Sequence, residues 1–99
     1  MTDLQCPATA VLLDGKDPPP PWLERLRVAG WLAPDPGPAP LADTIGDTAD
    51  QYRGETFVVT AASADITAVL KEHRISAVPP VVLEVDSEGW RVKGTGLWT

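Results

Sequence analysis

Short runs of apolar residues recur along the chain, separated in its second half by one amphipathic stretch. Residues 8–13, 55–60 and 81–85 are rich in β-branched or aliphatic side chains, which predicts three buried strands. Between the last two runs, apolar residues repeat at helical spacing through residues 65–74. Ser63 is placed to cap the helix that this spacing predicts. The second half of the chain therefore predicts a strand, a helix and a strand.

Proline interrupts the pattern in the first half of the chain, where nine of the eleven prolines lie before residue 41. Because proline is tolerated in the first turn of a helix, residues 20–29 predict a helix that Gly30 ends. Residues 34–54 begin with alternating prolines and continue with acids, a composition that favours extended surface chain. We predict a proline-rich acidic loop there, with one helical turn at residues 41–45.

The last apolar run is followed by a turn and a second short run at residues 90–93, which predicts a C-terminal β-hairpin. The predicted order is β-α-loop-β-α-β-β. A β-α-β unit implies a parallel pair of strands, and the hairpin adds an antiparallel pair. We predict an α/β fold: a small sandwich with helices over a mixed sheet. A chain of 99 residues supports one core, so residues 1–99 are expected to form a single domain.

Charge and composition exclude several functions. The net charge of −6 argues against nucleic acid or an anionic membrane as a partner, since phosphate binding needs clustered cations. No apolar run approaches the roughly 20 residues of a membrane-spanning helix, and the N-terminus lacks a secretory signal pattern. One cysteine excludes an internal disulfide and a multi-cysteine metal site. We expect a cytoplasmic protein without metal or cofactor, and the alanine-rich, lysine-poor composition is typical of a GC-rich bacterium or its phage.

The second half also resembles a known family. The strand around Phe57, the helix at 65–74, the Ile-Ser-Ala-Val-Pro segment that begins at Ile75, the hairpin and Gly94 together resemble the thioredoxin-like family. The resemblance covers roughly residues 55–96. It implies a thioredoxin-like sandwich.

The resemblance also implies roles for individual residues. The proline that is cis and borders the active site in that family maps onto Pro79, and an exposed backbone edge maps onto Ala77 and Val78. The place of the redox motif falls on residues 15–22, which contain no cysteine, and Pro80 departs from the family pattern. The family's final helix has no counterpart before the chain stops. The resemblance therefore implies a truncated, redox-inactive member, and such members generally serve as binding modules.

Two residues are candidates for catalysis, and we predict that neither is catalytic. Cys6 lacks the basic neighbour that activates a thiol, because Asp3 is the nearest charge. His73 is the one histidine, and its place late in a helix is explained by a favourable interaction with the helix dipole.

Four tryptophans in so short a chain predict a partner surface, since tryptophan is enriched at interface anchors. Trp22 and Trp31 flank the predicted first helix on opposite faces, so both cannot point to one core. Trp98 stands next to the C-terminus. We predict a protein-binding surface that includes the segment 34–50 and five further residues: Trp22, Ala77, Val78, Pro79 and Trp98.

These features favour a non-catalytic interaction module, a small accessory subunit or adaptor whose partner is a larger protein. One alternative is an enzyme or receptor: a single-cysteine thiol oxidoreductase using Cys6, or a small-molecule-binding protein at the C-terminal edge of the sheet. Another is an acidic inhibitor or immunity-type protein, whose charge would complement a basic target. Homo-oligomerisation is left open.

Overall fold

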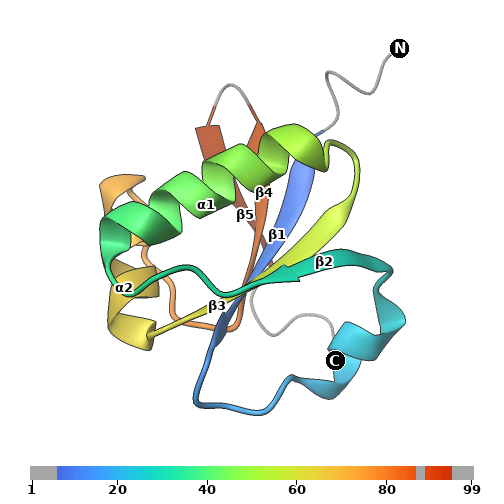
Figure 1. The fold of residues 1–99 in the computed structure, drawn as a ribbon, viewed down its shortest axis with the longest axis horizontal. Coiled ribbons are helices and arrows are strands. Elements are labelled where there is room, and N and C mark those ends of the chain that lie inside the picture. The colour runs from blue at the N-terminus through green and yellow to red at the C-terminus, as the bar shows by residue number, and fades with distance from the viewer. Residues whose placement is uncertain (1–6, 87–88, 95–99) are drawn as a thin grey trace.

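The computed structural model describes residues 7–86 and 89–94, which form five strands, two α-helices and one 3₁₀ helix (Figure 1). In chain order the elements are β1 (Ala8–Asp14), η2 (Pro21–Arg25), β2 (Val28–Leu32), α1 (Pro38–Gln51), β3 (Thr56–Ala61), α2 (Ser63–Glu72), β4 (Val81–Asp86) and β5 (Gly89–Gly94).

The strands form one mixed sheet in the order β2-β3-β1-β4-β5. Strands β1, β2 and β3 are parallel, whereas β4 runs antiparallel to β1 and forms a hairpin with β5. The predicted α/β class with a mixed sheet and a C-terminal hairpin is confirmed, as are the three strands expected from the apolar runs. In the centre of the sheet, Val11 of β1 lies opposite Val58 on one side and Val82 on the other.

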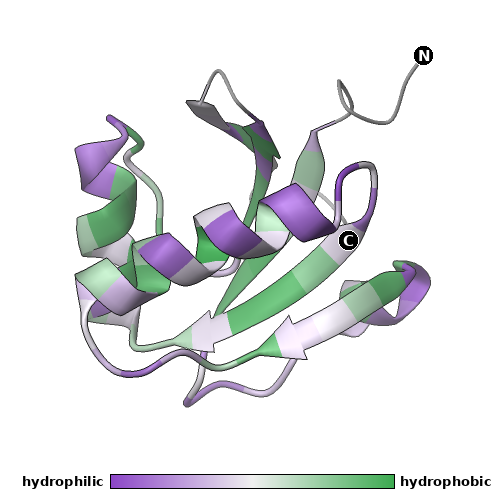
Figure 2. Ribbon diagram, turned by 45° about the horizontal axis from the view of Figure 1, so that its top comes forward, coloured by the Kyte–Doolittle hydropathy of each residue, from purple (hydrophilic) through white to green (hydrophobic). Residues whose placement is uncertain are grey.

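Both α-helices cover the same face of the sheet (Figures 1 and 2). Residues alternate between the faces of a strand, so Leu12, Phe57 and Leu83 point to the helices and are fully buried. From above them, Leu41 and Ile66 pack down from α1 and α2. Burying a side chain of this size stabilises the fold by about 1.5–3 kcal/mol.

The opposite face has a smaller core, which no α-helix covers within residues 7–86 and 89–94. There Val11, Val58 and Val82 are covered by Trp22 and Leu23 from the 3₁₀ helix η2. Trp22 is 6% exposed and Leu23 4% exposed, so this short helix inserts both side chains into the sheet surface.

The prediction of a helix at residues 20–29 is wrong. Proline does begin a helix, but it is the short η2, and the chain becomes extended before β2 begins at Val28. Gly30 lies within β2 and does not terminate a helix. A Cβ at Gly30 would lie 3.1 Å from the Tyr52 hydroxyl oxygen, so glycine allows the tyrosine ring to approach the strand.

The proline-rich acidic loop predicted at residues 34–54 is also corrected, because most of that segment is the α-helix α1. Pro38 and Pro40 occupy its first turn, where backbone N–H groups have no helical partner, and Gly37 precedes it with a φ of 118°. The helix is held by apolar and small side chains at helical spacing. Its buried residues are Leu41, Ile45, Thr48 and Ala49.

The predicted second helix is present as α2, but its N-cap residue is Ala62 and Ser63 is its first helical residue. The Gly37 N–H donates a hydrogen bond of 2.9 Å to the Asp65 carboxylate, which joins the start of α1 to the first turn of α2. One cis peptide bond lies among the described residues, between Pro79 and Pro80. The cis proline is therefore Pro80, one position after the proline onto which the family resemblance mapped it.

Candidate functional site: a groove beside helix α2

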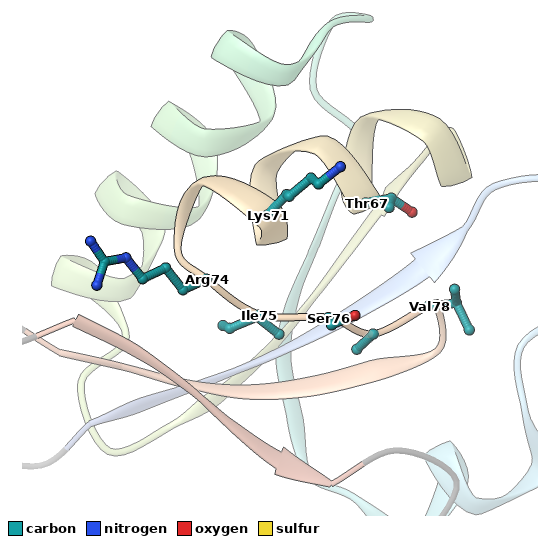
Figure 3. A pocket seen from close by; sticks show the side chains of 7 residues that line it. Thr67, Lys71, Arg74, Ile75, Ser76 and Val78 are labelled. Atoms are coloured by element: carbon teal, nitrogen blue, oxygen red, sulfur yellow. The ribbon is translucent and has the colours of Figure 1, made fainter.

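A groove of about 610 Å³ runs along the outer side of α2 (Figure 3). The chain reverses after α2 and returns beside the helix as an extended segment, residues 75–78, before β4 begins. We call the space between them the α2 groove. It is lined by Thr67, Lys71, Arg74, Ile75, Ser76, Ala77 and Val78.

A tight cap at the end of α2 creates the reversal. The Ile75 N–H donates to the Leu70 carbonyl at 2.9 Å, and the Arg74 N–H donates to the Lys71 carbonyl at 3.0 Å, while Ile75 packs against the helix-side core. This is the Schellman arrangement, in which the residue after the C-cap adopts a left-handed conformation and is usually glycine. Here that residue is Arg74, with a φ of 61°. A side chain there costs on the order of 1 kcal/mol.

The 75–78 segment presents an unpaired backbone edge. Ser76, Ala77 and Val78 form no backbone hydrogen bond with any residue in the described part of the chain, although the segment is next to the sheet. The Val78 side chain is 68% exposed, whereas Ala77 is half-buried against the core. The segment therefore offers N–H and C=O groups and one large apolar side chain to a partner.

Two cations border this edge. Lys71 and Arg74 are exposed, and neither forms an ion pair within residues 7–86 and 89–94. Lys71 extends along the helix towards Thr67, while Arg74 projects beyond the helix end (Figure 3). The Thr67 hydroxyl donates a hydrogen bond of 2.8 Å to the Ser63 carbonyl, so the hydroxyl oxygen can still accept a hydrogen bond from a partner. The groove thus has an apolar floor between positive side chains, on a protein whose net charge is −6.

The described residues that line the groove do not include the side chains that most often act as acid, base or thiol nucleophile. There is no cysteine, histidine, aspartate or glutamate among them. Ser76 and Lys71 are not hydrogen-bonded to each other, so the hydroxyl has no activating base. In the described part of the chain, no group of three or more His, Cys, Asp or Glu side chains is arranged to hold a metal ion.

The structure brings together part of the predicted partner surface. Ala77 and Val78 line the α2 groove, and half-buried Pro79 follows them directly. Trp22 does not belong with them, because it is buried in the core on the other face of the sheet. Trp98 lies outside the described residues, as does the candidate thiol Cys6.

His73 packs against the C-terminal hairpin at the end of α2. It is the C-cap residue of α2, and its ring stacks on Trp90 of β5 with ring centroids 3.8 Å apart and an interplanar angle of 6°. This contact ties the end of α2 to the C-terminal hairpin and leaves His73 outside the α2 groove.

Sequence reasoning missed the cationic residues of the groove. Thr67, Lys71 and Arg74 have the i, i+4, i+7 spacing of one helical face, and that spacing was a readable signal. The position of the 75–78 segment across the groove could not be predicted from the sequence, because it depends on the left-handed backbone conformation of Arg74.

Comparisons of the chain with protein-family models, curated proteins and solved structures found no match. The resemblance to the thioredoxin-like family therefore stays a prediction. Neither described helix is long and apolar enough to cross a membrane.

Proposed function

We propose that the protein is a non-catalytic interaction module, a small accessory subunit or adaptor that binds a larger protein through the α2 groove. The observation that carries this proposal is the unpaired backbone edge at Ser76, Ala77 and Val78, which borders an open groove. An extended segment of a partner satisfies such an edge by adding backbone hydrogen bonds, and side-chain pockets beside it supply selectivity.

The chemistry of the groove supports binding over catalysis. Val78 gives an exposed apolar contact at one end of the edge, and Lys71 and Arg74 give positive charge along it. The module acts in the cytoplasm of a bacterium or in phage-infected cells, in keeping with its single cysteine and its composition. In this proposal it is a redox-inactive relative of thioredoxin-like proteins, since the place expected for the redox motif holds no thiol.

A variant pair tests the proposal by affinity capture. The tagged protein is recovered from its native source at low and high salt, and co-purifying proteins are identified by mass spectrometry. Val78→Asp places a charge on the apolar end of the edge, and Val92→Asp places the same charge on β5, where Val92 is 43% exposed. We expect a stoichiometric companion with the wild type and with Val92→Asp, and its loss with Val78→Asp. Equal recovery with both variants would contradict the use of the α2 groove.

A second candidate function, an acidic inhibitor of a basic protein, is favoured by the solvent face of α1. Asp43 and Asp47 are exposed there without an ion-pair partner in the described part of the chain, while Asp50 pairs with Arg53 at 3.0 Å. In that case the companion is lost at high salt because screening weakens exposed charge pairs, and Asp43→Asn with Asp47→Asn abolishes capture. Retention of the companion by this double variant excludes the inhibitor.

A further inference from the structure

We propose that the partner segment in the α2 groove is acidic: an extended stretch with two carboxylates on alternate residues, which meet Lys71 and Arg74. This inference rests on the proposed function, because it names the chemistry of the segment that binds at the same site. Three observations carry it: the sign of the charge around the groove, the directions of the two cations, and the length of the unpaired backbone edge.

Helix α2 separates its charges by direction. Lys71 and Arg74 line the groove, whereas the carboxylates of Asp65 and Glu72 do not. Asp65 instead accepts the hydrogen bond from the Gly37 N–H at the start of α1. The side of α2 that borders the groove is therefore positive, and no carboxylate among the described lining residues competes for the two cations.

A second groove, between the end of α1 and the C-terminal hairpin, has the opposite charge. It has a volume of about 300 Å³, and its lining contains the carboxylates of Asp47, Asp50 and Asp86 but only one guanidinium, that of Arg53. An acidic segment is repelled there and attracted to the α2 groove. The net charge of −6 does not reverse this preference, because salt at physiological ionic strength screens charges over about 8 Å.

The two cations of the α2 groove diverge. Lys71 extends towards Thr67, while Arg74 projects beyond the helix end (Figure 3), so they are placed to meet two carboxylates rather than one. In the described part of the chain, neither cation is held in an ion pair. Exposed ion pairs are individually weak. The two pairs therefore select among extended segments, whose binding also draws on the backbone edge and on Val78.

The length of the backbone edge sets the spacing of the carboxylates. The edge is confined to residues 76–78, because Pro79 and Pro80 have no N–H and the chain turns at Arg74. Three extended residues span about 10 Å, which a partner strand of about five residues covers. Because side chains alternate along a strand, about two of them face α2, and these are separated by one residue. Two carboxylates on alternate residues therefore match the two cations.

The groove is suited to a polypeptide rather than to a phosphate chain. Its backbone edge pairs with another peptide backbone, and its floor includes the apolar side chains of Ile75, Ala77 and Val78. Nucleic acids require clustered cations, whereas this groove contains two. An acidic protein segment is thus the occupant that uses all three properties of the groove.

Backbone amide NMR of the purified full chain, titrated with designed peptides, tests the inference. The probe is Val-Thr-Glu-Thr-Glu-Thr-Val, blocked at both ends, which has carboxylates on alternate residues and the same order in both directions. One control peptide replaces both glutamates by glutamine. Another, Val-Glu-Glu-Thr-Thr-Thr-Val, keeps the composition but makes the carboxylates adjacent. We expect the probe to shift the amide signals of Ser76, Ala77 and Val78, and both controls to bind about fivefold more weakly.

Charge variants assign the preference to the two cations. Lys71→Gln is expected to weaken binding of the acidic probe about twofold to threefold and to leave binding of the glutamine peptide unchanged. The double variant with Arg74→Gln is expected to bind the two peptides equally. Arg27→Gln is the matched control, because Arg27 is exposed beside β2 and does not line the groove. It is expected to retain the full preference.

The outcomes separate this inference from the proposed function. If the glutamine peptide binds as tightly as the probe and Val78→Asp abolishes both interactions, the groove binds peptides but the inferred acidity is overturned. A preference that survives the double variant, or equal shifts with a short oligothymidylate, also overturns it. So does a lack of response at residues 76–78 to every peptide. In that case affinity capture with Val78→Asp still decides the proposed function.

Discussion

The two faces of the sheet are covered by different means. Among the described residues, α1 and α2 contribute six buried side chains to the core on one face, whereas η2 contributes two to the core on the other. A cover made of many side chains can adjust when one of them is shortened. A cover of two adjusts less, because in the described part of the chain only the partly buried Leu26 and Val28 pack beside them against the strands. The six are Leu41, Ile45, Ala49, Ile66, Val69 and Leu70, and the two are Trp22 and Leu23.

The comparison is tested most directly by shortening one covering residue on each face. Trp22→Ala uncovers Val11 and Val58 and is expected to lower the free energy of unfolding by about 4 kcal/mol. Leu41→Ala on α1 is expected to cost about 3 kcal/mol, because neighbouring helix residues relax towards the gap. Urea denaturation of both variants measures the difference. A smaller loss for Trp22→Ala than for Leu41→Ala would contradict the unequal cover.

Two glycine substitutions test how closely side chains pack on the helix-covered face of the sheet, one at Gly30 of β2 and one at Gly46 of α1. Gly30→Ala pushes a Cβ to 3.1 Å from the Tyr52 hydroxyl and is expected to lower the free energy of unfolding by about 1–2 kcal/mol. Gly46→Ala lies inside α1 with no atom within 4 Å of the added Cβ, so it is expected to raise that free energy by about 0.5–1 kcal/mol. Thermal or urea unfolding shows the two signs, and the same sign for both would refute the close approach at Gly30.

The smallest expected change in stability concerns Arg74, which follows the C-cap of α2 beside the α2 groove. Arg74→Gly removes the side chain from a left-handed position and is expected to raise the free energy of unfolding by about 0.5–1 kcal/mol. In the proposed function it also weakens partner capture. Lys71→Gln serves as the control, because it removes a neighbouring charge without changing backbone strain. If Arg74→Gly destabilised the protein, the side chain would have a structural role that its left-handed backbone does not indicate.

The second half of the chain was predictable because its strands are continuous apolar runs and its helix has a clear apolar face. Beyond the strand at residues 8–13, the first half was not predictable, because proline there indicates either the start of a helix or an extended loop. At Pro38 and Pro40 it starts a helix, yet alternating prolines before an acidic stretch also predict extended loop. The spacing of Leu41 and Ile45 was the signal that decides between them. Gly30 was predicted to end a helix. Its contact in β2 is with the Tyr52 ring, which is distant in sequence and so gives no local signal.

The candidate site was predictable only in part, and for a related reason. Ala77 and Val78 were expected at an exposed edge, and they line the groove. Trp22 and Trp31 could not be told apart by spacing, since their burial depends on where β2 begins and on its register with β3. The convergence of Lys71 with the 75–78 segment depends on a backbone conformation at Arg74 that its residue type disfavours.

The position of β1 has a consequence for how the molecule is made. It is translated before the other described strands, yet it lies in the middle of the sheet between β3 and β4. Its neighbour β3 is separated from it by η2, β2 and α1, and β4 comes later still. The nascent chain therefore carries an apolar strand whose two sides remain unpaired until β3, and then β4, have been translated. Because sheet assembly requires encounters between segments distant in sequence, β1 is the strand most exposed to aggregation during that interval.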